Sequence, residues 1–284
     1  MSSFNEHNCV SFFELFCIRV LKTGRIPQHI AFIMDGNRRF AKKHSVNKSE
    51  GHHKGFDKLS ETLKWCLDLG IPEVTVYAFS IENFKRSEEE VNGLMDLARE
   101  KFKKLLEEID QINEWGVRFH IAGRLSLLPE DLRALISRAM LATKHNNKLR
   151  LNIAYAYTGR DEISRAASHI IDGVKDNELS PEDIKPSLIS EMLELGEPEL
   201  LVRTSGEVRL SDFMLWQVSK TVLYFTDVLW PEFTIWNLLA AIIYYQRHAP
   251  EISVEEEELC QRELEFLDKQ RNCKWKELEK YTAC

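Results

Sequence analysis

Residues 29–40 read HIAFIMDGNRRF, a short apolar run followed by an acid, a glycine, an amide and two arginines. The nearly continuous apolar run over 29–34 predicts a strand buried on both faces, as in a parallel sheet. The residues after it predict the start of a helix, whose first amide groups favour anions. The segment therefore predicts a strand that presents polar side chains at its carboxyl end, where α/β folds bind ligands.

Five further β-type runs follow, and segments of helical periodicity separate them. Apolar residues at 56, 59, 63 and 66 form one helical face that Gly70 closes, and residues 88–115 predict one long amphipathic helix closed by Gly116. This alternation predicts an α/β fold, a single domain with a mostly parallel central sheet flanked by helices. The predicted strands are 29–34, 73–80, 117–122, 149–156, 199–204 and 222–228.

Composition limits the classes of protein. The chain has 284 residues and 44% hydrophobic residues, enough for one large core. A net charge of −7 argues against a duplex nucleic-acid binder, so any anion site must be local. The six cysteines form no C-x-x-C pair or zinc spacing and are expected to be reduced thiols facing the cytosol.

Both ends differ from the central domain, which we expect over 25–250. Residues 1–24 contain an amphipathic segment at 9–21 that suits a helix lying in a membrane interface, or equally one packed on the domain or a partner. Residues 251–284 are acidic and predict a surface helix or helical hairpin without a chemical motif. The chain contains no apolar run of the roughly 20 residues that span a bilayer.

The residues after the first strand indicate a magnesium-diphosphate site. Gly36 allows close approach to the backbone, and Arg38 and Arg39 beside helix amides suit a diphosphate. The carboxylate of Asp35 would repel phosphate unless a divalent cation such as Mg²⁺ bridged the two. The alternative is that Asp35 and Asn37 cap a helix while the arginines are solvated.

Two later segments add a second anion site and an apolar wall. In residues 200–213 a strand ends in Arg203, and Arg209 and Ser211 follow in a flexible turn. In residues 77–87 aromatic groups lie beside an amide and a cation, which suits a substrate with an apolar tail, although an ordinary loop with buried aromatics is the alternative. The candidate residues of that segment are Phe79, Asn83 and Arg86.

Five motifs in the same order resemble the successive signatures of the cis-prenyltransferase family, in its eukaryotic branch: IAFIMDGNRRFAKK, EGHHKGF, YAFSIENFKR, RTSGEVRLSDFMLWQ and FTDVLWPEF. The resemblance covers residues 26–248. It implies a transferase that repeatedly condenses isopentenyl diphosphate onto farnesyl diphosphate with cis double bonds, giving dehydrodolichyl diphosphate for dolichol synthesis and protein glycosylation. Geranylgeranyl diphosphate remains open as the primer.

The resemblance also implies roles for the candidate residues. Asp35 would hold Mg²⁺ on the diphosphate, and Phe79, Asn83 and Arg86 would shape the reacting centre, with Arg86 also binding substrate. The proton acceptor is open between a diphosphate oxygen and a relay through Asn37 and His52. The allylic diphosphate would be bound by Gly36, Asn37, Arg38, Arg39 and His52, and the isopentenyl diphosphate by Arg203, Arg209 and Ser211.

A long product needs an apolar tunnel, and the predicted long helix has a suitable apolar face. Ordinary core packing explains the same pattern equally well. The residues concerned are Phe102, Leu105, Leu106, Ile109 and Ile112.

Two departures from the homodimeric bacterial members indicate an incomplete site. Val222 stands where those relatives have an acidic residue, and the sequence contains no Arg-x-Gly motif. The resemblance implies a heteromer in which a non-catalytic subunit of the Nogo-B receptor type supplies that motif, peripherally attached to the cytosolic face of the endoplasmic reticulum membrane.

Other classes fit less well. The chain lacks the Asp-rich motifs of trans-prenyltransferases, the G-x-G-x-x-G of dinucleotide-binding folds and the P-loop of nucleotide kinases. The stronger rival is a non-catalytic scaffold subunit, but such subunits lose the first-motif aspartate and arginines that are present here.

Overall fold

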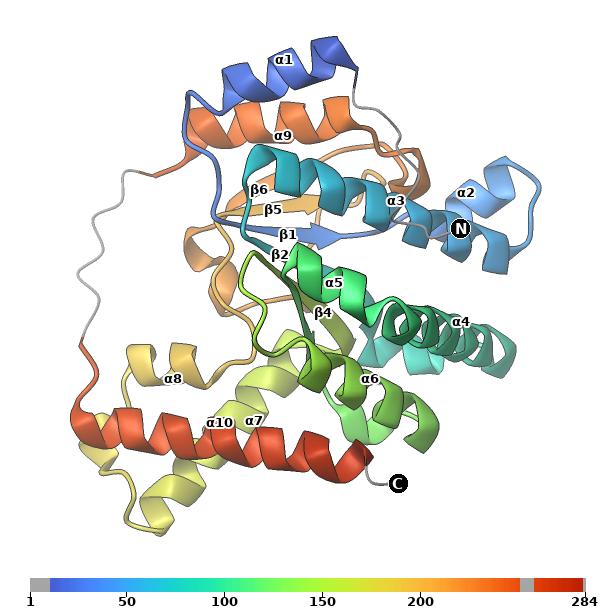
Figure 1. Ribbon diagram of the computed structural model, residues 1–284. Coiled ribbons are helices and arrows are strands. Elements are labelled where there is room, and N and C mark those ends of the chain that lie inside the picture. The colour runs from blue at the N-terminus through green and yellow to red at the C-terminus, as the bar shows by residue number, and fades with distance from the viewer. Residues whose placement is uncertain (1–10, 251–257, 283–284) are drawn as a thin grey trace.

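The computed structural model describes residues 11–250 and 258–282 of the chain. A six-stranded sheet in the order β3-β4-β2-β1-β5-β6 forms its centre, and every neighbouring pair is parallel (Figure 1). The predicted α/β fold is confirmed. The strands are β1 (His29–Ile33), β2 (Glu73–Ser80), β3 (Val117–Ala122), β4 (Leu149–Tyr157), β5 (Leu200–Arg203) and β6 (Val222–Phe225).

Helices fill the connections between strands, as parallel pairing requires, except that the connection from β5 to β6 contains a single short 3₁₀ helix, Gln217–Lys220. The α-helices are α1 (Phe12–Leu21), α2 (Asn37–Lys43), α3 (Lys48–Leu69), α4 (Glu88–Glu107), α5 (Ile109–Trp115), α6 (Glu130–Ala142), α7 (Gly159–Lys175), α8 (Pro186–Met192), α9 (Ile235–His248) and α10 (Gln261–Thr282). Helix α1 lies beside α9, and α10 packs against α6 and α8 on the opposite side of the molecule (Figure 1).

The hydrophobic core on one face of the sheet is much larger than the core on the other face. Alternate residues of β1 show the division, since Ile30 and Phe32 join the large core under α3, α4, α6 and α9. Ala31 and Ile33 join a smaller cluster with Phe213 and other residues of the loop after β5. Because both faces are covered, all five residues of β1 are buried, which explains its continuous apolar sequence.

Several predicted boundaries differ from the structure. The single helix expected over 88–115 is wrong, because a turn at Glu108 separates α4 from α5. The sequence contains no glycine or proline there to mark the break. The last two strands end earlier than expected, since the amide groups of Ser205 and Gly206 bond to the carbonyl groups of Val228 and Thr226 in a loop pairing.

The two ends of the chain follow the predicted helical pattern where they are described. Residues 9 and 10 of the predicted N-terminal segment lie outside the described residues, and the rest forms α1. In the C-terminal part, residues 261–282 form one helix rather than a hairpin. The four cysteines within the described ranges, Cys17, Cys66, Cys260 and Cys273, are free thiols. No helix in those ranges is both long enough and apolar enough to cross a bilayer.

Candidate active site

A cavity of about 680 Å³ lies at the carboxyl ends of β1, β2 and β5. Strand β1 lies between β2 and β5 in the parallel sheet, so the segments that follow the three strands meet at one edge. Every predicted site residue lines this cavity: Asp35, Gly36, Asn37, Arg38, Arg39, His52, Phe79, Asn83, Arg86, Arg203, Arg209 and Ser211.

Asp35 is fixed between the ends of β1 and β5. Its amide donates to Thr204 Oγ1 at 3.0 Å, and the Thr204 hydroxyl donates to the Asp35 carbonyl at 2.7 Å. One carboxylate oxygen accepts from Arg203 Nη2 at 2.9 Å, while the side chain stays 36% exposed. The other oxygen accepts from the Gly36 amide at 2.7 Å, so Asp35 presents to the cavity a carboxylate whose orientation is already fixed.

Gly36 makes the turn from β1 into α2. Its φ of 112° is a left-handed conformation, and a Cβ there would lie 3.1 Å from the Leu229 Cα. Gly36 is itself the N-cap of α2, and within the described parts of the chain no side chain caps this helix. The alternative in which Asp35 and Asn37 act as helix caps is therefore wrong, and the first amides of α2 stay available to a ligand.

Asn37 and His52 bring unpaired polar atoms into the cavity. Asn37 Oδ1 and His52 Nε2 are buried and have no hydrogen-bond partner in the described structure. Two glycines of α3 allow the approach of α2, because a Cβ on Gly55 would lie 2.4 Å from Asn37 Oδ1 and one on Gly51 would lie 2.6 Å from the Asn37 carbonyl oxygen. Buried unpaired polar atoms are costly, so these two are suited to bind a polar ligand.

The loop after β5 forms the second basic wall. Arg203 donates to Ser211 Oγ at 2.8 Å and to the Arg209 carbonyl, which folds the loop back onto the strand. Arg39 crosses from α2 to bond the Ser205 carbonyl at 2.7 Å. The two predicted anion sites thus share one cavity, and Arg39 links them.

The β2 segment supplies the third wall. Phe79 is 1% exposed and stacks on Tyr155 with ring centres 5.2 Å apart. Asn83 Oδ1 accepts the Ser80 amide at 3.0 Å, so its oxygen caps the short helix Ile81–Lys85. Arg86 brings a positive charge to this wall of the cavity, and Glu82 brings a negative one.

Electrostatics favour a neutral histidine beside these cations. Burial and the charge of Arg86 lower the pKa of His52 to about 4. Burial, followed by the charge of Arg38, also lowers the pKa of Arg86, which stays protonated at any ordinary pH. His52 therefore meets a ligand uncharged at neutral pH.

A second, apolar cavity of about 170 Å³ adjoins the basic one. It lies among α3, α4, α5 and the large-core face of the sheet, and Phe102, Leu105 and Ile112 line it, while Leu106 and Ile109 do not. Six residues line both cavities and form their junction: Met34, Asn37, His52, Ala78, Phe79 and Leu94.

The structure adds residues that motif analysis did not select. Gly51 and Gly55 lie within EGHHKGF, and their spacing on one helical face was the available signal. Tyr77 and Arg160 also line the cavity, and Arg160 pairs with Asp212 at 2.8 Å. Arg160 lies in the first turn of α7, more than 40 residues before the motif that starts at Arg203, so no local pattern connects it with the site.

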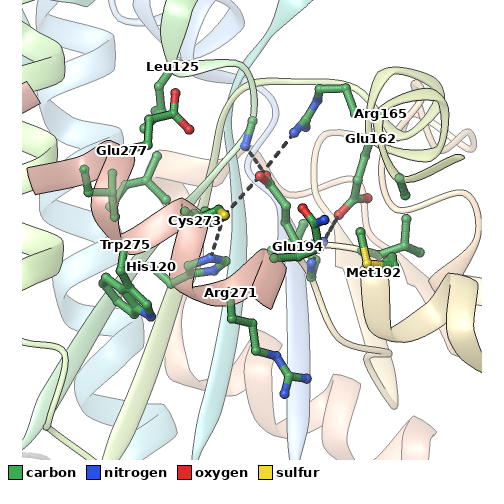
Figure 2. A pocket seen from close by; sticks show the side chains of 18 of the residues that line it. His120, Leu125, Glu162, Arg165, Met192, Glu194, Arg271, Cys273, Trp275 and Glu277 are labelled. Atoms are coloured by element: carbon green, nitrogen blue, oxygen red, sulfur yellow. Dashed lines mark hydrogen bonds and ion pairs between the residues drawn. The ribbon is translucent and has the colours of Figure 1, made fainter. Parts of the chain in front are cut away.

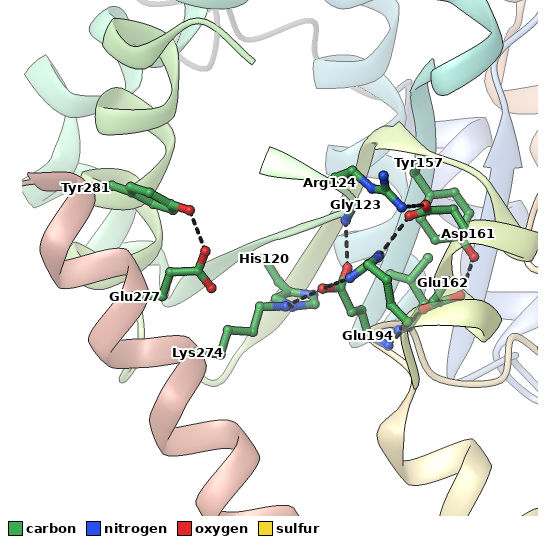
Figure 3. Close-up of polar contacts among 12 residues, drawn as sticks. His120, Gly123, Arg124, Tyr157, Asp161, Glu162, Glu194, Lys274, Glu277 and Tyr281 are labelled. Carbon is green, nitrogen blue, oxygen red and sulfur yellow. Dashed lines mark hydrogen bonds and ion pairs between the residues drawn. The ribbon is translucent and has the colours of Figure 1, made fainter. Parts of the chain in front are cut away.

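A third cavity, of about 710 Å³, lies under α10 (Figure 2), and none of its lining residues lines the active-site cavity. Lys274 of α10 reaches into it, donating to Glu194 at 3.0 Å and lying 3.4 Å from His120 Nε2 (Figure 3). Glu194 also accepts from Arg165 at 3.2 Å and from the Gly123 amide at 2.6 Å. Glu194 is thus paired with both Lys274 and Arg165. Because Lys274 belongs to α10 and Glu194 to the core, this network anchors α10 to the core.

Comparison with known proteins identifies the family. The profile described as putative undecaprenyl diphosphate synthase matches residues 33–252. The chain belongs to the cis-prenyltransferase family. The match excludes α10. A DHDDS subunit of the dehydrodolichyl diphosphate synthase complex from Homo sapiens is 56% identical over 240 residues, which are 84% of this chain and 72% of that protein.

Other relatives come from archaea and from solved structures. A tritrans,polycis-undecaprenyl-diphosphate synthase (geranylgeranyl-diphosphate specific) from Thermococcus kodakarensis is 42% identical over 83% of this chain and 90% of its own length. The crystal structure of lavandulyl diphosphate synthase from Lavandula x intermedia, in complex with dimethylallyl diphosphate, aligns with a TM-score of 0.73 and 35% identity over 78% of this chain and 95% of that one.

Proposed function

We propose that this chain elongates farnesyl diphosphate by repeated condensation with isopentenyl diphosphate, forming cis double bonds and a long polyprenyl (dehydrodolichyl) diphosphate for dolichol synthesis and protein glycosylation. The observation that carries the proposal is the junction between a basic cavity and an apolar one. A molecule with an anionic head and a growing hydrocarbon tail fits both parts at once. Family membership and the human DHDDS relative support the same reaction.

The basic cavity suits two diphosphate groups. Arg38 and Arg39 line the first wall with the first amides of α2, and Arg86 of the β2 wall shares Glu90 with Arg38, while Arg203 and Arg209 line the second wall. Guanidinium groups bind phosphate oxygens in a bidentate manner and neutralise the charge that develops on a leaving diphosphate. We assign the allylic diphosphate to the first wall and isopentenyl diphosphate to the second.

The donor set at Asp35 fits Mg²⁺ shared with substrate. The partly exposed carboxylate of Asp35 is suited to this ion, because Mg²⁺ keeps several waters and uses one or two carboxylates plus substrate phosphates. When bound, Mg²⁺ would neutralise diphosphate charge during ionisation of the allylic substrate. Asp35 would hold it while Arg203 keeps the carboxylate oriented.

The remaining residues protect and deprotonate the intermediate. Phe79 and the apolar residues at the junction exclude water from the allylic carbocation. The condensed intermediate then loses a proton, and the C–H electron pair forms the new double bond. Neutral His52 and the unpaired Asn37 oxygen lie at the junction, so a relay through them and a diphosphate oxygen both remain available as acceptors.

We also propose that the active enzyme is a heteromer. Val222 does not line the cavity, and the sequence contains no Arg-x-Gly motif, so a non-catalytic subunit of the Nogo-B receptor type would complete the site. The human relative is named as a subunit of a complex, which supports this arrangement. Helix α1 exposes Phe12, Phe13 and Phe16, and peripheral attachment at the cytosolic face of the endoplasmic reticulum fits such a surface.

The test is incorporation of radiolabelled isopentenyl diphosphate with farnesyl diphosphate and Mg²⁺, by the chain alone and with the partner subunit. Long polyprenol that forms strongly only with the partner supports both catalysis and the heteromer. Equal activity without the partner would contradict the proposal that the active enzyme is a heteromer. No activity in either mixture would favour the alternative that the chain is a non-catalytic scaffold subunit.

Replacing Asp35 with alanine separates catalysis from scaffolding within the active complex. We expect a loss of at least about 100-fold in turnover, because Mg²⁺ would lose the carboxylate that holds it at the end of β1. Asp96→Ala, which removes an exposed carboxylate of α4, is the control and keeps full activity. An Asp35→Ala complex with normal turnover would show that the chain is a scaffold.

A further inference from the structure

Glu90 gathers cations from three elements directly behind the basic cavity. Its Oε1 accepts from Arg86 Nη1 at 2.9 Å and lies 3.9 Å from Arg38 Nη1, and its Oε2 lies 3.3 Å from Lys48 Nζ. Arg86 precedes α4, Arg38 belongs to α2, and Lys48 begins α3. One carboxylate therefore connects the three segments that surround the first diphosphate wall.

Glu90 lies outside the lining of the cavity, unlike two of its cationic partners. Arg38 and Arg86 line the cavity, and Glu90 does not. The Glu90 side chain is only 7% exposed, against 57% for Arg38 and 25% for Arg86. The carboxylate thus lies one layer behind the guanidinium groups that face the ligand.

The charges explain why such a carboxylate is needed. Two guanidinium groups that share one wall repel each other, and this repulsion contributes to the lowered pKa of Arg86. Burial alone raises the pKa of Glu90, but the Lys48 hydrogen bond and the two arginines keep that pKa below its ordinary value. Glu90 is therefore ionised at neutral pH and offsets the repulsion.

We propose that Glu90 is a positioning residue that fixes Arg86 and Arg38 in one arrangement facing the allylic diphosphate. This inference rests on the proposed function, and it deepens the account of the diphosphate wall. Glu90 does not contact substrate in this arrangement. It acts by restricting the two guanidinium groups before the substrate arrives, so that little reorganisation is left for the reaction.

The inference predicts opposite effects on binding and turnover. In Glu90→Gln the wall loses a negative charge, so its attraction for diphosphate is kept or increased. The guanidinium groups lose their fixed arrangement, and we expect kcat to fall about tenfold while KM for farnesyl diphosphate does not rise. Glu90→Asp keeps the charge and should recover part of kcat.

Kinetics of the active complex form the first experiment, with wild type, Glu90→Gln, Glu90→Asp and Glu89→Gln. Glu89 is an exposed residue of the same helical turn, so its variant controls for the loss of one carboxylate near α4. Unchanged kcat in Glu90→Gln overturns the inference. A joint fall in kcat and thermal stability with a rise in KM also overturns it, since that pattern indicates a structural role.

A second experiment does not depend on activity. The arginine Nε–H resonances of the full chain are recorded by NMR, and Arg86→Lys assigns the Arg86 signal. A resolved Arg86 signal that collapses to the averaged position in Glu90→Gln, but not in Glu89→Gln, supports positioning. A signal that stays resolved in Glu90→Gln overturns it. If the wild-type complex fails to condense substrate, the proposed function fails, and the NMR comparison still decides whether Glu90 fixes Arg86.

Discussion

Gly51 and Gly55 of α3 both face Asn37, but they meet different parts of it. A Cβ on Gly55 would meet the Asn37 side chain, which can rotate away, whereas a Cβ on Gly51 would meet the Asn37 backbone, which cannot. We expect Gly55→Ala to keep the free energy of unfolding, because alanine also favours a helix by up to about 1 kcal/mol. Its turnover should fall about tenfold or more as Asn37 leaves the junction.

Gly51→Ala should show the opposite pattern in stability. Its Cβ forces α2 away from α3, and we expect a loss of about 1–3 kcal/mol in the free energy of unfolding by urea denaturation. Gly93→Ala is the control, because a Cβ there meets nothing within 4 Å and should stabilise α4. A stable and fully active Gly55→Ala variant would contradict the assigned role of Asn37.

His52 should make stability depend on pH. Its pKa is about 4 in the folded chain and about 6.5 when unfolded, so the unfolded chain takes up a proton between these values that the folded chain does not. Stability is therefore lost as the pH falls through this window, by about 2 kcal/mol at pH 5 relative to pH 8. In His52→Asn the free energy of unfolding, measured by denaturation, should depend on pH less than in wild type by that amount. His145→Asn, at an exposed position, is the matched control.

At the scale of elements, α10 shows how a helix outside the family match is attached to the core. Burial alone would raise the pKa of Glu194, but Lys274 and Arg165 hold that pKa well below its usual range. Lys274→Met removes one cation and leaves Arg165, so we expect a loss of about 1–2 kcal/mol in the free energy of unfolding.

The control for α10 is Lys269→Met. Lys269 pairs with Glu178 on the exposed side of the same helix, with 55% of its side chain exposed. Surface pairs of this kind contribute at most about 1 kcal/mol, so this variant should unfold close to wild type. Equal stability of the two variants would show that the buried network does not anchor α10.

For the whole molecule, the joined cavities relate the fold to product length. Ala78 lines both cavities at their junction, and Ala78→Leu should narrow the passage for the growing tail. We expect the active complex to make shorter products, resolved by chromatography, at a first-condensation rate within about threefold of wild type. Ala240→Leu adds the same volume at an exposed position of α9 and should leave product length unchanged. Products of normal length from Ala78→Leu would place the tail elsewhere.

Much of the fold and site was predictable, because the signals are local. The apolar strands predict the parallel sheet, and Asp35, Arg38 and Arg203 lie at or just beyond the carboxyl ends of strands, which meet at one edge. The break at Glu108 was not predictable, since no glycine or proline stands there to mark the end of a helix. Glu90 was also missed, because a glutamate in the first turn of a helix resembles an ordinary favourable charge.

The sequence by itself determined the α/β class, the order of the strands along the chain and the motif residues of the three walls, such as Asp35 and Arg203. Each of these depends on periodicity or on a short motif, and neighbours in the chain are enough to specify it. Tertiary structure alone decided that the three walls share one cavity, that this cavity joins an apolar one, and that Glu90 lies behind two of its arginines. These features join segments up to about 170 residues apart, as in the bond from Arg203 to Asp35, and only the packing of helices on the sheet brings such segments together.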